Sequence, residues 1–147
     1  MRLVIQRVSE AKVQVDSEVV GQIEQGLLVL IAISENDTES NVLALAQKLI
    51  KLRIFKDELN KMNLDINQIN GKILLVSQFT LYADLKRGSR PSFSHAAKPE
   101  LAKELYLSFG KALSDLDVAV EYGVFGADMK VSLCNDGPVT LVLDSDT

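Results

Sequence analysis

The sequence predicts a single α+β domain with a mostly antiparallel, barrel-like sheet at its core and two helices. Three observations support this fold class. Most apolar segments alternate with polar residues, as expected for strands that bury one face. Two segments instead repeat their apolar residues every three or four positions, as amphipathic helices do. No linker, internal repeat or low-complexity tract interrupts the 147 residues, so one domain over 1–147 is expected.

The first part of the chain is predicted to form strands. Alternating apolar residues indicate one long or bulged strand over 2–15, and a turn at 16–18 joins it to a short strand over 19–23. Residues 27–33 are apolar on both faces, which is typical of a strand in the centre of a sheet.

A helix is predicted next. Asn36 and Glu39 have the spacing of a capping box, which indicates that the helix begins there. Its buried face consists of apolar residues at helical spacing: Val42, Leu45, Ala46, Leu49 and Leu52. A short strand over 53–56 and a polar loop follow, and Asn70-Gly71 predicts the turn into the next strand.

Residues 74–82, with the sequence Leu-Leu-Val-Ser-Gln-Phe-Thr-Leu-Tyr, predict a strand that crosses the middle of the sheet. Alternation places Gln78 and Thr80 on one face of this strand, and Ser77 and Phe79 on the other. A buried hydroxyl or amide without a partner costs roughly 1–3 kcal/mol. These polar groups therefore bond neighbouring backbone or face a pocket, and the residues alone leave both interpretations open.

The second half of the chain begins with a basic loop over 85–98. Pro99 suits the first turn of a second helix. The apolar face of this helix consists of Ala102, Leu105, Phe109, Ala112 and Leu113. Alternating residues predict further strands over 118–122 and 129–133.

A tight turn over 135–138 is predicted between the strand 129–133 and a last strand that begins at Val139. Gly137 permits unusual φ values, and only about 5–6% of X-Pro bonds are cis. A rigid turn is the simpler interpretation of the Gly137–Pro138 pair. A cis bond would instead point two successive carbonyl oxygens the same way, as acceptors for an ammonium group.

The composition indicates the cellular compartment of the protein and whether it binds a metal. No apolar run approaches the ~20 residues of a membrane span, and the N-terminal residues do not form a signal peptide. The single cysteine, Cys134, excludes an internal disulfide, and no Cys/His cluster suits zinc. We expect a cytoplasmic protein without metal or cofactor, in which Cys134 is a buried structural thiol.

The formal net charge of −4 argues against nucleic acid as a general partner, but basic residues cluster locally. Lys86, Arg87 and Arg90 lie in a segment, 85–99, that contains no acidic residue. A second stretch, with Asp57 and Glu58 as its only acids, contains Lys48, Lys51, Arg53, Lys56 and Lys61. Solvated loops and local phosphate-binding sites both explain such clusters, and composition does not decide between them.

Conventional hydrolase machinery is not evident. A Ser or Thr nucleophile needs an adjacent base that a third group orients. His95 is the only histidine, and no acidic residue beside it could orient it, so a surface or helix-capping role is expected. Neither a glycine-rich phosphate loop nor a pair of carboxylates with acid/base spacing is apparent.

Four motifs together closely resemble the D-aminoacyl-tRNA deacylase family, the D-tyrosyl-tRNA deacylases. They are Leu75-Val-Ser-Gln-Phe-Thr-Leu-Tyr-Ala-Asp84, Arg90-Pro-Ser-Phe93, Phe125-Gly-Ala-Asp-Met129 and Asn135-Asp-Gly-Pro-Val-Thr140. With the opening Gln6-Arg-Val8, the similarity runs through nearly the whole chain. Ala32 and Tyr122 stand where the family tends to have Gly and Thr, outside the motifs that contact substrate, and are interpreted as packing variation.

The resemblance implies a hydrolase that cleaves the ester between a D-amino acid and the 3′-terminal adenosine of tRNA, and that also releases mischarged glycine. It implies tRNA as the partner, rather than DNA or a membrane, and a homodimer with two sites at the subunit interface. The catalytic residues would be Ser77, Gln78, Phe79 and Thr80. Substrate would be bound by Gly137, Pro138, Arg7, Phe125 and Met129, and the tRNA phosphates by Lys86, Arg87 and Arg90.

In this family the Gly-Pro pair, with a cis bond, reaches into the pocket of the partner subunit. By resemblance, Gly137 and Pro138 would hold the substrate ammonium and exclude an L side chain, while Arg7 fixes their loop. Backbone N–H groups around Phe79 and Thr80 could stabilise an oxyanion, and the terminal ribose hydroxyl could assist the attacking water.

Three alternatives stay open. Thr80 could act as a covalent nucleophile instead of a positioning residue. The chain could be a non-catalytic RNA-binding module that uses the same basic loop, or an editing domain of the same fold that acts on an L-amino acid. Neither the preferred D-amino acid nor discrimination among tRNAs follows from the sequence.

Overall fold

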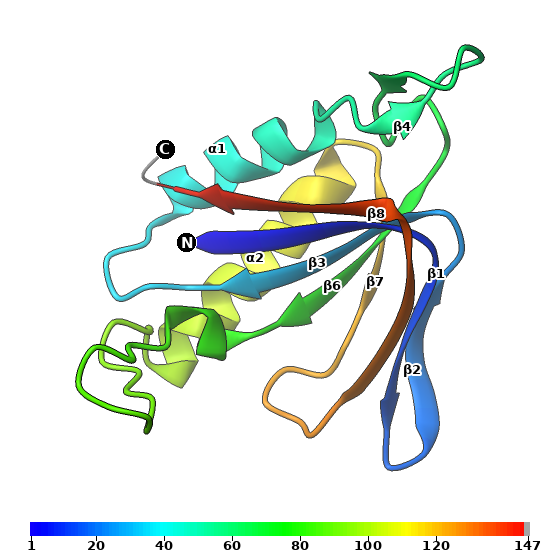
Figure 1. The fold of residues 1–147 in the computed structure, drawn as a ribbon. Helices are drawn as coiled ribbons and strands as arrows, with labels where there is room; N and C mark the ends of the chain where they lie inside the picture. The colour runs from blue at the N-terminus through cyan, green and yellow to red at the C-terminus, as the bar shows by residue number, and fades with distance from the viewer. Residues whose placement is uncertain (146–147) are drawn as a thin grey trace.

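The computed structural model describes residues 1–145. Its main sheet has six strands, five of them in the order β2-β1-β3-β6-β7, and β8 pairs with β1 (Figure 1). The strands of this sheet are β1 Arg2–Val15, β2 Glu18–Ile23, β3 Gly26–Ala32, β6 Lys72–Ser77, β7 Ala119–Tyr122 and β8 Lys130–Asp144. The remaining elements are α1 Glu39–Ile50, α2 Pro99–Asp115, the 3-10 helix η1 Phe79–Tyr82 and a small hairpin of β4 Phe55–Lys56 and β5 Met62–Leu64.

The long strand β1 organises the sheet, because its two halves use different partners. Its first half lies between β3 and β8, and its second half lies between β2 and β8. The register with β8 shifts between Gln6 and Glu10, and such bulges bend a strand. The predicted long, bulged strand over 2–15 is therefore confirmed.

The two helices pack together on one face of the sheet (Figure 1). Phe109 of α2 and Leu49 of α1 are fully buried in the cluster that covers this face. A second, smaller apolar cluster, which includes Val13 and Leu74, lies inside the curved sheet. The β3–β6 and β6–β7 pairs are parallel, and the other strand pairs are antiparallel. This arrangement confirms the predicted α+β class with a barrel-like sheet.

Helix α1 begins later than predicted. Its N-cap is Thr38, whose backbone N–H donates to Asn41 Oδ1 at 2.8 Å, so the capping box is Thr38–Asn41 and not Asn36–Glu39. The Glu39 carboxylate instead accepts a 2.6 Å hydrogen bond from the Ser108 hydroxyl and ties α1 to α2. Spacing alone could not distinguish the two pairs, because both have an acceptor side chain three residues after the first polar residue.

Helix α2 forms as predicted, with Pro99 in its first turn and its apolar face buried. Tyr106 and Gly110 are buried on the same face. A Cβ at position 110 would collide with the hydroxyl of Tyr122, so only glycine lets this tyrosine pack against the helix. Gly110 therefore makes room for Tyr122, which stands where the family tends to have Thr.

The predicted strand over 74–82 is wrong in its second half. β6 ends at Ser77, and residues 79–82 form η1. The parallel partner of β6 is β3, which ends at Ala32, one residue after the Ile31–Ser77 pair. The last backbone bond between the two segments runs from Gln78 N to Ile31 O, and among the described residues no strand partner lies beyond it. The chain turns instead through i→i+3 hydrogen bonds, from Leu81 N to Gln78 O and from Ala83 N to Thr80 O. The predicted alternation of Gln78 and Thr80 against Phe79 therefore does not apply.

The two predicted strands around 135–138 are one strand, β8, that pairs with β1 on both sides of the motif. The register passes from Val8↔Asn135 to Gln6↔Thr140, so residues 136–139 bulge outward opposite Arg7. Cys134 lies on this strand with its side chain exposed, which corrects the prediction of a buried thiol. Its position opposite Glu10 places it on the outer face of the sheet.

Candidate active site

A pocket of about 570 Å³ opens at the end of the sheet where β3 and β6 stop. Its walls come from the ends of these strands, the start of η1, the first turns of α2 and residues 125–131. Five of the residues predicted for the site line it together: Ser77, Gln78, Phe79, Phe125 and Met129. Segments nearly fifty residues apart in the chain thus meet around one cavity.

The walls of the pocket are mainly apolar and aromatic. The rings of Phe79 and Phe93 meet edge to face with centroids 5.0 Å apart. Phe93 was not predicted as a site residue, although it closes the Arg90-Pro-Ser-Phe93 motif, and an isolated aromatic residue in a basic loop is the signal that could have found it. Such walls suit a planar, aromatic part of a ligand, which stacks on rings.

Thr80 lies at the edge of this site, not in its lining. Its side chain is exposed, and its hydroxyl accepts a hydrogen bond from Gln78 Nε2. The first N–H groups of a helix have no partner within the helix. The backbone N–H groups of Phe79 and Thr80 therefore lie at the free N-terminal end of η1, beside the pocket.

Tyr82 in η1 and Tyr106 in the pocket wall remain protonated at neutral pH. Burial raises the pKa of Tyr82 to about 12, and the charge of Asp37 acts in the same direction. Burial also raises the pKa of Tyr106, whose hydroxyl donates to the Leu75 carbonyl at 3.1 Å. His95 lies exposed in the loop before α2. Within residues 1–145, no group of three or more His, Cys, Asp or Glu side chains is placed to hold a metal ion.

Arg7 fixes the loop of residues 135–139. Its side chain is only 3% exposed, and its Nη1 and Nε donate to the carbonyls of Ile54, at 2.6 Å, and Asp136, at 2.9 Å. Asn135 Oδ1 also accepts a 2.8 Å bond from Val139 N inside the loop. The loop is thus held from within and from β1.

Gly137 and Pro138 are exposed at the tip of this loop, and the peptide bond between them is cis. Neither residue, nor Arg7, lines the pocket of the same chain. Arg7 pairs with Leu27 in the β1–β3 register, whereas the β3 wall of the pocket begins at Ile31. Four residues along a strand correspond to roughly 13 Å, so loop and pocket are separate in one subunit.

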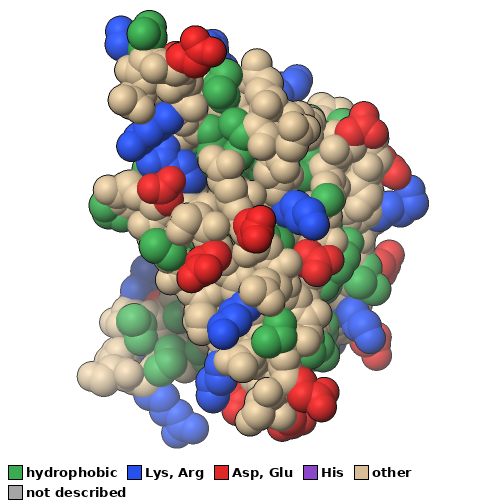
Figure 2. Space-filling model, turned by 90° about the vertical axis from the view of Figure 1, so that its right-hand side faces the viewer, with side chains coloured by type: hydrophobic (Ala, Val, Ile, Leu, Met, Phe, Trp, Pro, Cys, Tyr) green, Lys and Arg blue, Asp and Glu red, His purple; other side chains and the backbone are tan. Residues whose placement is uncertain are grey.

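The predicted basic residues Lys86, Arg87 and Arg90 are exposed in the loop between η1 and α2. A bridge between Asp84 and Ser92 closes this loop at its base, next to Phe93 and the pocket. On the face shown in Figure 2, Lys and Arg side chains are interspersed with Asp and Glu and form no continuous patch. This face therefore offers no continuous basic surface to a polyanion.

No helix among residues 1–145 is long and apolar enough to cross a membrane.

Comparisons with known proteins agree on one family. The model of the D-Tyr-tRNA(Tyr) deacylase family matches residues 4–144. A protein of Thermosipho africanus (strain TCF52B) named D-aminoacyl-tRNA deacylase is 55% identical over 145 residues, which cover 99% of this chain and 97% of that protein.

Solved structures have the same fold. One described as a c-Myc DNA unwinding element binding protein superposes with a TM-score of 0.92 at 37% identity, over 98% of both chains. A second, described as a probable eukaryotic D-amino acid tRNA deacylase, gives a TM-score of 0.83 over 97% of both chains. At 18% identity, this second similarity concerns the fold alone.

Proposed function

Because the chain belongs to the D-Tyr-tRNA(Tyr) deacylase family and is a D-aminoacyl-tRNA deacylase, we propose that it proofreads chirality as a homodimer and also removes glycine from tRNA. The observation that carries this proposal is the composition of the pocket. Side chains of three family motifs, among them Gln78, Phe93 and Phe125, line one cavity although they are far apart in sequence.

The pocket would receive the 3′ end of the aminoacylated tRNA. The edge-to-face pair of Phe79 and Phe93 offers aromatic surface to the terminal adenine, as single-stranded RNA sites commonly do. Ser77 and Gln78 bring polar groups to the same wall, where they would hydrogen-bond the ribose and the ester. This end of the pocket therefore has the chemistry needed to hold the base and the scissile bond.

The second half of the site would come from the other subunit. Gly137 and Pro138 are exposed and lie away from the pocket of their own chain, so a shared site needs the loop of a partner. Among the described strands, β8 pairs with β1 alone, so its other edge is open to a second copy. The carbonyls of the Gly137–Pro138 loop would then accept hydrogen bonds from the substrate ammonium.

Such a loop selects chirality by exclusion. Once ammonium and ester are held, the enantiomers differ only in the direction of the side chain, and a rigid wall blocks the L direction. A wall of this kind tolerates many D side chains and cannot reject glycine, which has none. The proposed mechanism therefore couples broad D specificity to glycine removal.

The chemical step would rely on positioning. The N–H groups of Phe79 and Thr80 would stabilise the oxyanion that forms when water attacks the ester. The ribose hydroxyl next to the ester would assist that water, so no side-chain base is required. Thr80, at the edge of the pocket, would position this end of η1 through its bond from Gln78.

The direct test compares D-Tyr-tRNA, L-Tyr-tRNA and Gly-tRNA as substrates of the purified protein. We expect hydrolysis of the D-tyrosyl and glycyl esters and survival of the L-tyrosyl ester. Hydrolysis of the L ester at the D rate would contradict the chiral filter and favour an editing domain for L-amino acids. Protection of all three esters would indicate a non-catalytic RNA-binding module.

Thr80→Ala is expected to lower kcat by about 2- to 13-fold, because one hydrogen bond contributes about 0.5–1.5 kcal/mol. Ser108→Ala is a matched control, since its hydroxyl is also exposed and bonded to one side chain, Glu39. Steady-state hydrolysis of D-Tyr-tRNA measures both. An inactive Thr80→Ala protein that folds and binds tRNA would instead support a nucleophilic Thr80, which a trapped acyl-enzyme would identify.

Neutralising Lys86, Arg87 and Arg90 together is expected to weaken tRNA binding and to reduce its salt dependence, with the D/L preference unchanged. The reason is that these side chains are exposed beside the pocket and would contact acceptor-stem phosphates. Binding titrations at several salt concentrations measure the effect. The comparison variant neutralises Lys48, Lys51 and Lys56. If only this variant loses salt dependence, the phosphates are contacted along 48–61 instead.

DNA binding is a second candidate, because a solved relative at 37% identity is described as a DNA unwinding element binding protein. The net charge of −4 argues against an extended duplex-binding surface, and the face shown in Figure 2 has no continuous basic patch. We therefore expect the chain to bind aminoacylated tRNA in preference to duplex DNA. Competition of the two for the protein, at one fixed salt concentration, tests this preference.

A further inference from the structure

The turn η1, which carries Phe79 and Thr80, has little apolar packing. None of its four residues, Phe79–Tyr82, is buried, and Phe79 is 57% exposed. Its N-terminal end is held by the backbone bond from Gln78 N to Ile31 O at 2.8 Å, by the ring contact of Phe79 with Phe93 and by the side-chain bond from Gln78 to Thr80. A segment with so little buried surface opens easily unless polar contacts hold its other end.

The other end of η1 is held by Arg2. Its Nη1 donates to the Leu81 carbonyl at 3.1 Å, and its Cζ lies 5.4 Å from the centre of the Tyr82 ring. An arginine in this position combines a hydrogen bond to the turn with a cation–π contact to the next residue. Arg2 therefore connects β1 to the C-terminal end of η1.

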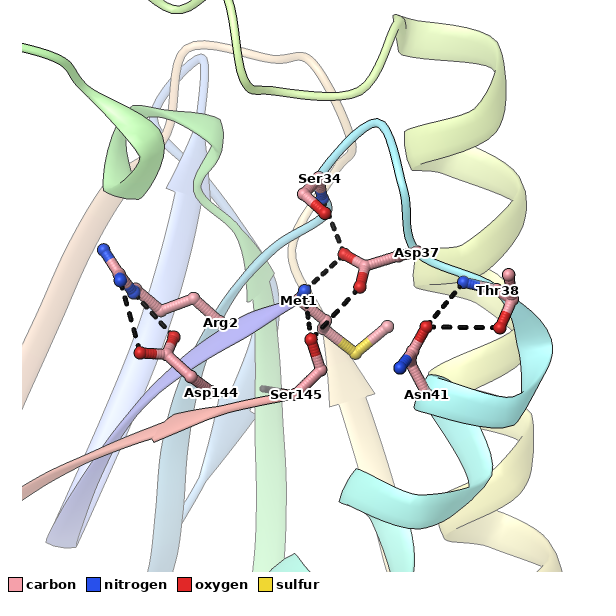
Figure 3. Close-up of polar contacts among 8 residues, drawn as sticks. All are labelled: Met1, Arg2, Ser34, Asp37, Thr38, Asn41, Asp144 and Ser145. Atoms are coloured by element: carbon pink, nitrogen blue, oxygen red, sulfur yellow. Dashed lines mark hydrogen bonds and ion pairs between the residues drawn. The ribbon is translucent and has the colours of Figure 1, made fainter. Parts of the chain in front are cut away.

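Asp144 orients the Arg2 side chain. Its two carboxylate oxygens accept bonds from Arg2 Nε at 2.7 Å and from Nη2 at 3.2 Å, which leaves Nη1 aimed at η1. Figure 3 shows Arg2 and Asp144 facing each other at the paired ends of β1 and β8. Next to them, Ser145 and Asp37 bind the backbone amino group of Met1, so both strand ends are anchored (Figure 3).

We propose that Arg2, oriented by Asp144, is a positioning residue for deacylation: it clamps the C-terminal end of η1 so that Phe79 and Thr80 keep their places at the pocket. This inference rests on the proposed role of η1 in the reaction. Arg2 does not line the pocket, so it acts through Leu81 and Tyr82 and not on the substrate. The clamp also couples the pairing of β1 with β8 to the geometry of the site.

The variants Arg2→Ala, Arg2→Lys and Asp144→Asn test the clamp. Arg2→Ala is expected to lower kcat for D-Tyr-tRNA by about 10-fold or more with little change in KM, because small displacements of positioning groups act mainly on the chemical step. Arg2→Lys is expected to keep part of the wild-type kcat, because its ammonium group keeps the positive charge. It lacks the planar guanidinium, which binds the Leu81 carbonyl and the Asp144 carboxylate at the same time. Asp144→Asn has a smaller effect, because the bond to Leu81 remains possible.

Two further measurements separate positioning from stability. The Arg2–Asp144 pair is partly exposed, with side-chain exposures of 38% and 28%, so Tm should shift by no more than about 3 °C. Hydrogen exchange should accelerate at the amides of Leu81 and Ala83, which close η1, and stay unchanged at Leu75 in β6. Lys111→Ala is the control, because it breaks another exposed Arg/Lys–Asp pair, Lys111–Asp115, remote from η1.

Faster exchange in η1 together with a lower kcat in Arg2→Ala supports the clamp. Unchanged exchange, or faster exchange with unchanged kcat, overturns it. A loss of kcat that Lys111→Ala reproduces also overturns it, because any surface ion pair would then have the same effect. Failure of the proposed function is distinguishable, since the wild-type protein itself would not hydrolyse D-Tyr-tRNA.

Discussion

Gly137→Ala is expected to lower the hydrolysis of D-Tyr-tRNA by about 100-fold or more, which corresponds to about 2.7 kcal/mol. The backbone of Gly137 has φ +138°, a conformation that residues with a side chain rarely adopt. A Cβ there would lie 2.9 Å from Arg7 Nη2 and 2.9 Å from Val139 Cγ2. Arg7 is buried and bonded to two carbonyls, so the loop must move instead, and the proposed ammonium site moves with it.

The protein should remain folded in this variant, because the loop is exposed and carries little of the core. We expect the free energy of unfolding to fall by about 1–3 kcal/mol, the usual cost of backbone strain. Gly88→Ala provides the comparison for this cost, because Gly88 has φ +121° and a Cβ added there would have no atom within 4 Å. Activity at the wild-type level in Gly137→Ala would remove the loop from the proposed site.

Mixing two inactive variants tests whether the site is shared. Ala127→Trp is designed to fill the pocket, whose lining includes Ala127, and Gly137→Ala displaces the loop. If each site combines the pocket of one subunit with the loop of the other, a mixed dimer has one intact site. Random exchange should then restore about a quarter of the wild-type activity, because half of the dimers are mixed and each has one of two sites. A site within one subunit would give no restoration.

Arg7→Ala is expected to have the largest effect on stability, with a loss of about 2–5 kcal/mol in the free energy of unfolding. The substitution leaves the buried carbonyl of Ile54 without the hydrogen bond that Arg7 donates to it. It also removes the hydrogen bond from Arg7 to the carbonyl of Asp136. Hydrolysis should fall with it, because the Gly137–Pro138 loop loses its support. Chemical denaturation and the D-Tyr-tRNA assay measure the two effects.

Arg53→Ala is the matched control for Arg7→Ala. Arg53 also donates to a backbone carbonyl, that of Asn63 at 2.9 Å, but its side chain is exposed and water can replace it. Its removal should cost less than about 1 kcal/mol. Equal losses in the two variants would show that burial of Arg7 is not what makes it important.

Much of the fold follows from the spacing of apolar residues. Alternation predicts β1 with its bulge, and apolarity on both faces predicts the central position of β3. The helical stripe of α2 and Pro99 at its first turn predict that helix and its start. These features can be predicted from the sequence because the period of the apolar residues indicates which side chains are buried, and that period differs between strands and helices.

The family motifs also indicate which residues meet, but not how. Ser77, Gln78, Phe79, Phe125 and Met129 line one pocket. Thr80 lies at its edge, and the aromatic partner of Phe79 was found only in the structure. Whether Gly137 and Pro138 complete this pocket remains a prediction.

The sequence by itself determined the fold class, the strands and helices with a clear period, and the motifs that identify the family. Tertiary structure alone decided where β6 ends, that β8 is continuous, that Thr38 caps α1 and that Cys134 is exposed. Each of these depends on a hydrogen-bond partner or a neighbour supplied by a distant segment. The hydrogen bond from Arg2 to the Leu81 carbonyl also joins residues nearly eighty positions apart. It could not be predicted, because no local sequence pattern indicates which carbonyl a guanidinium group will bind.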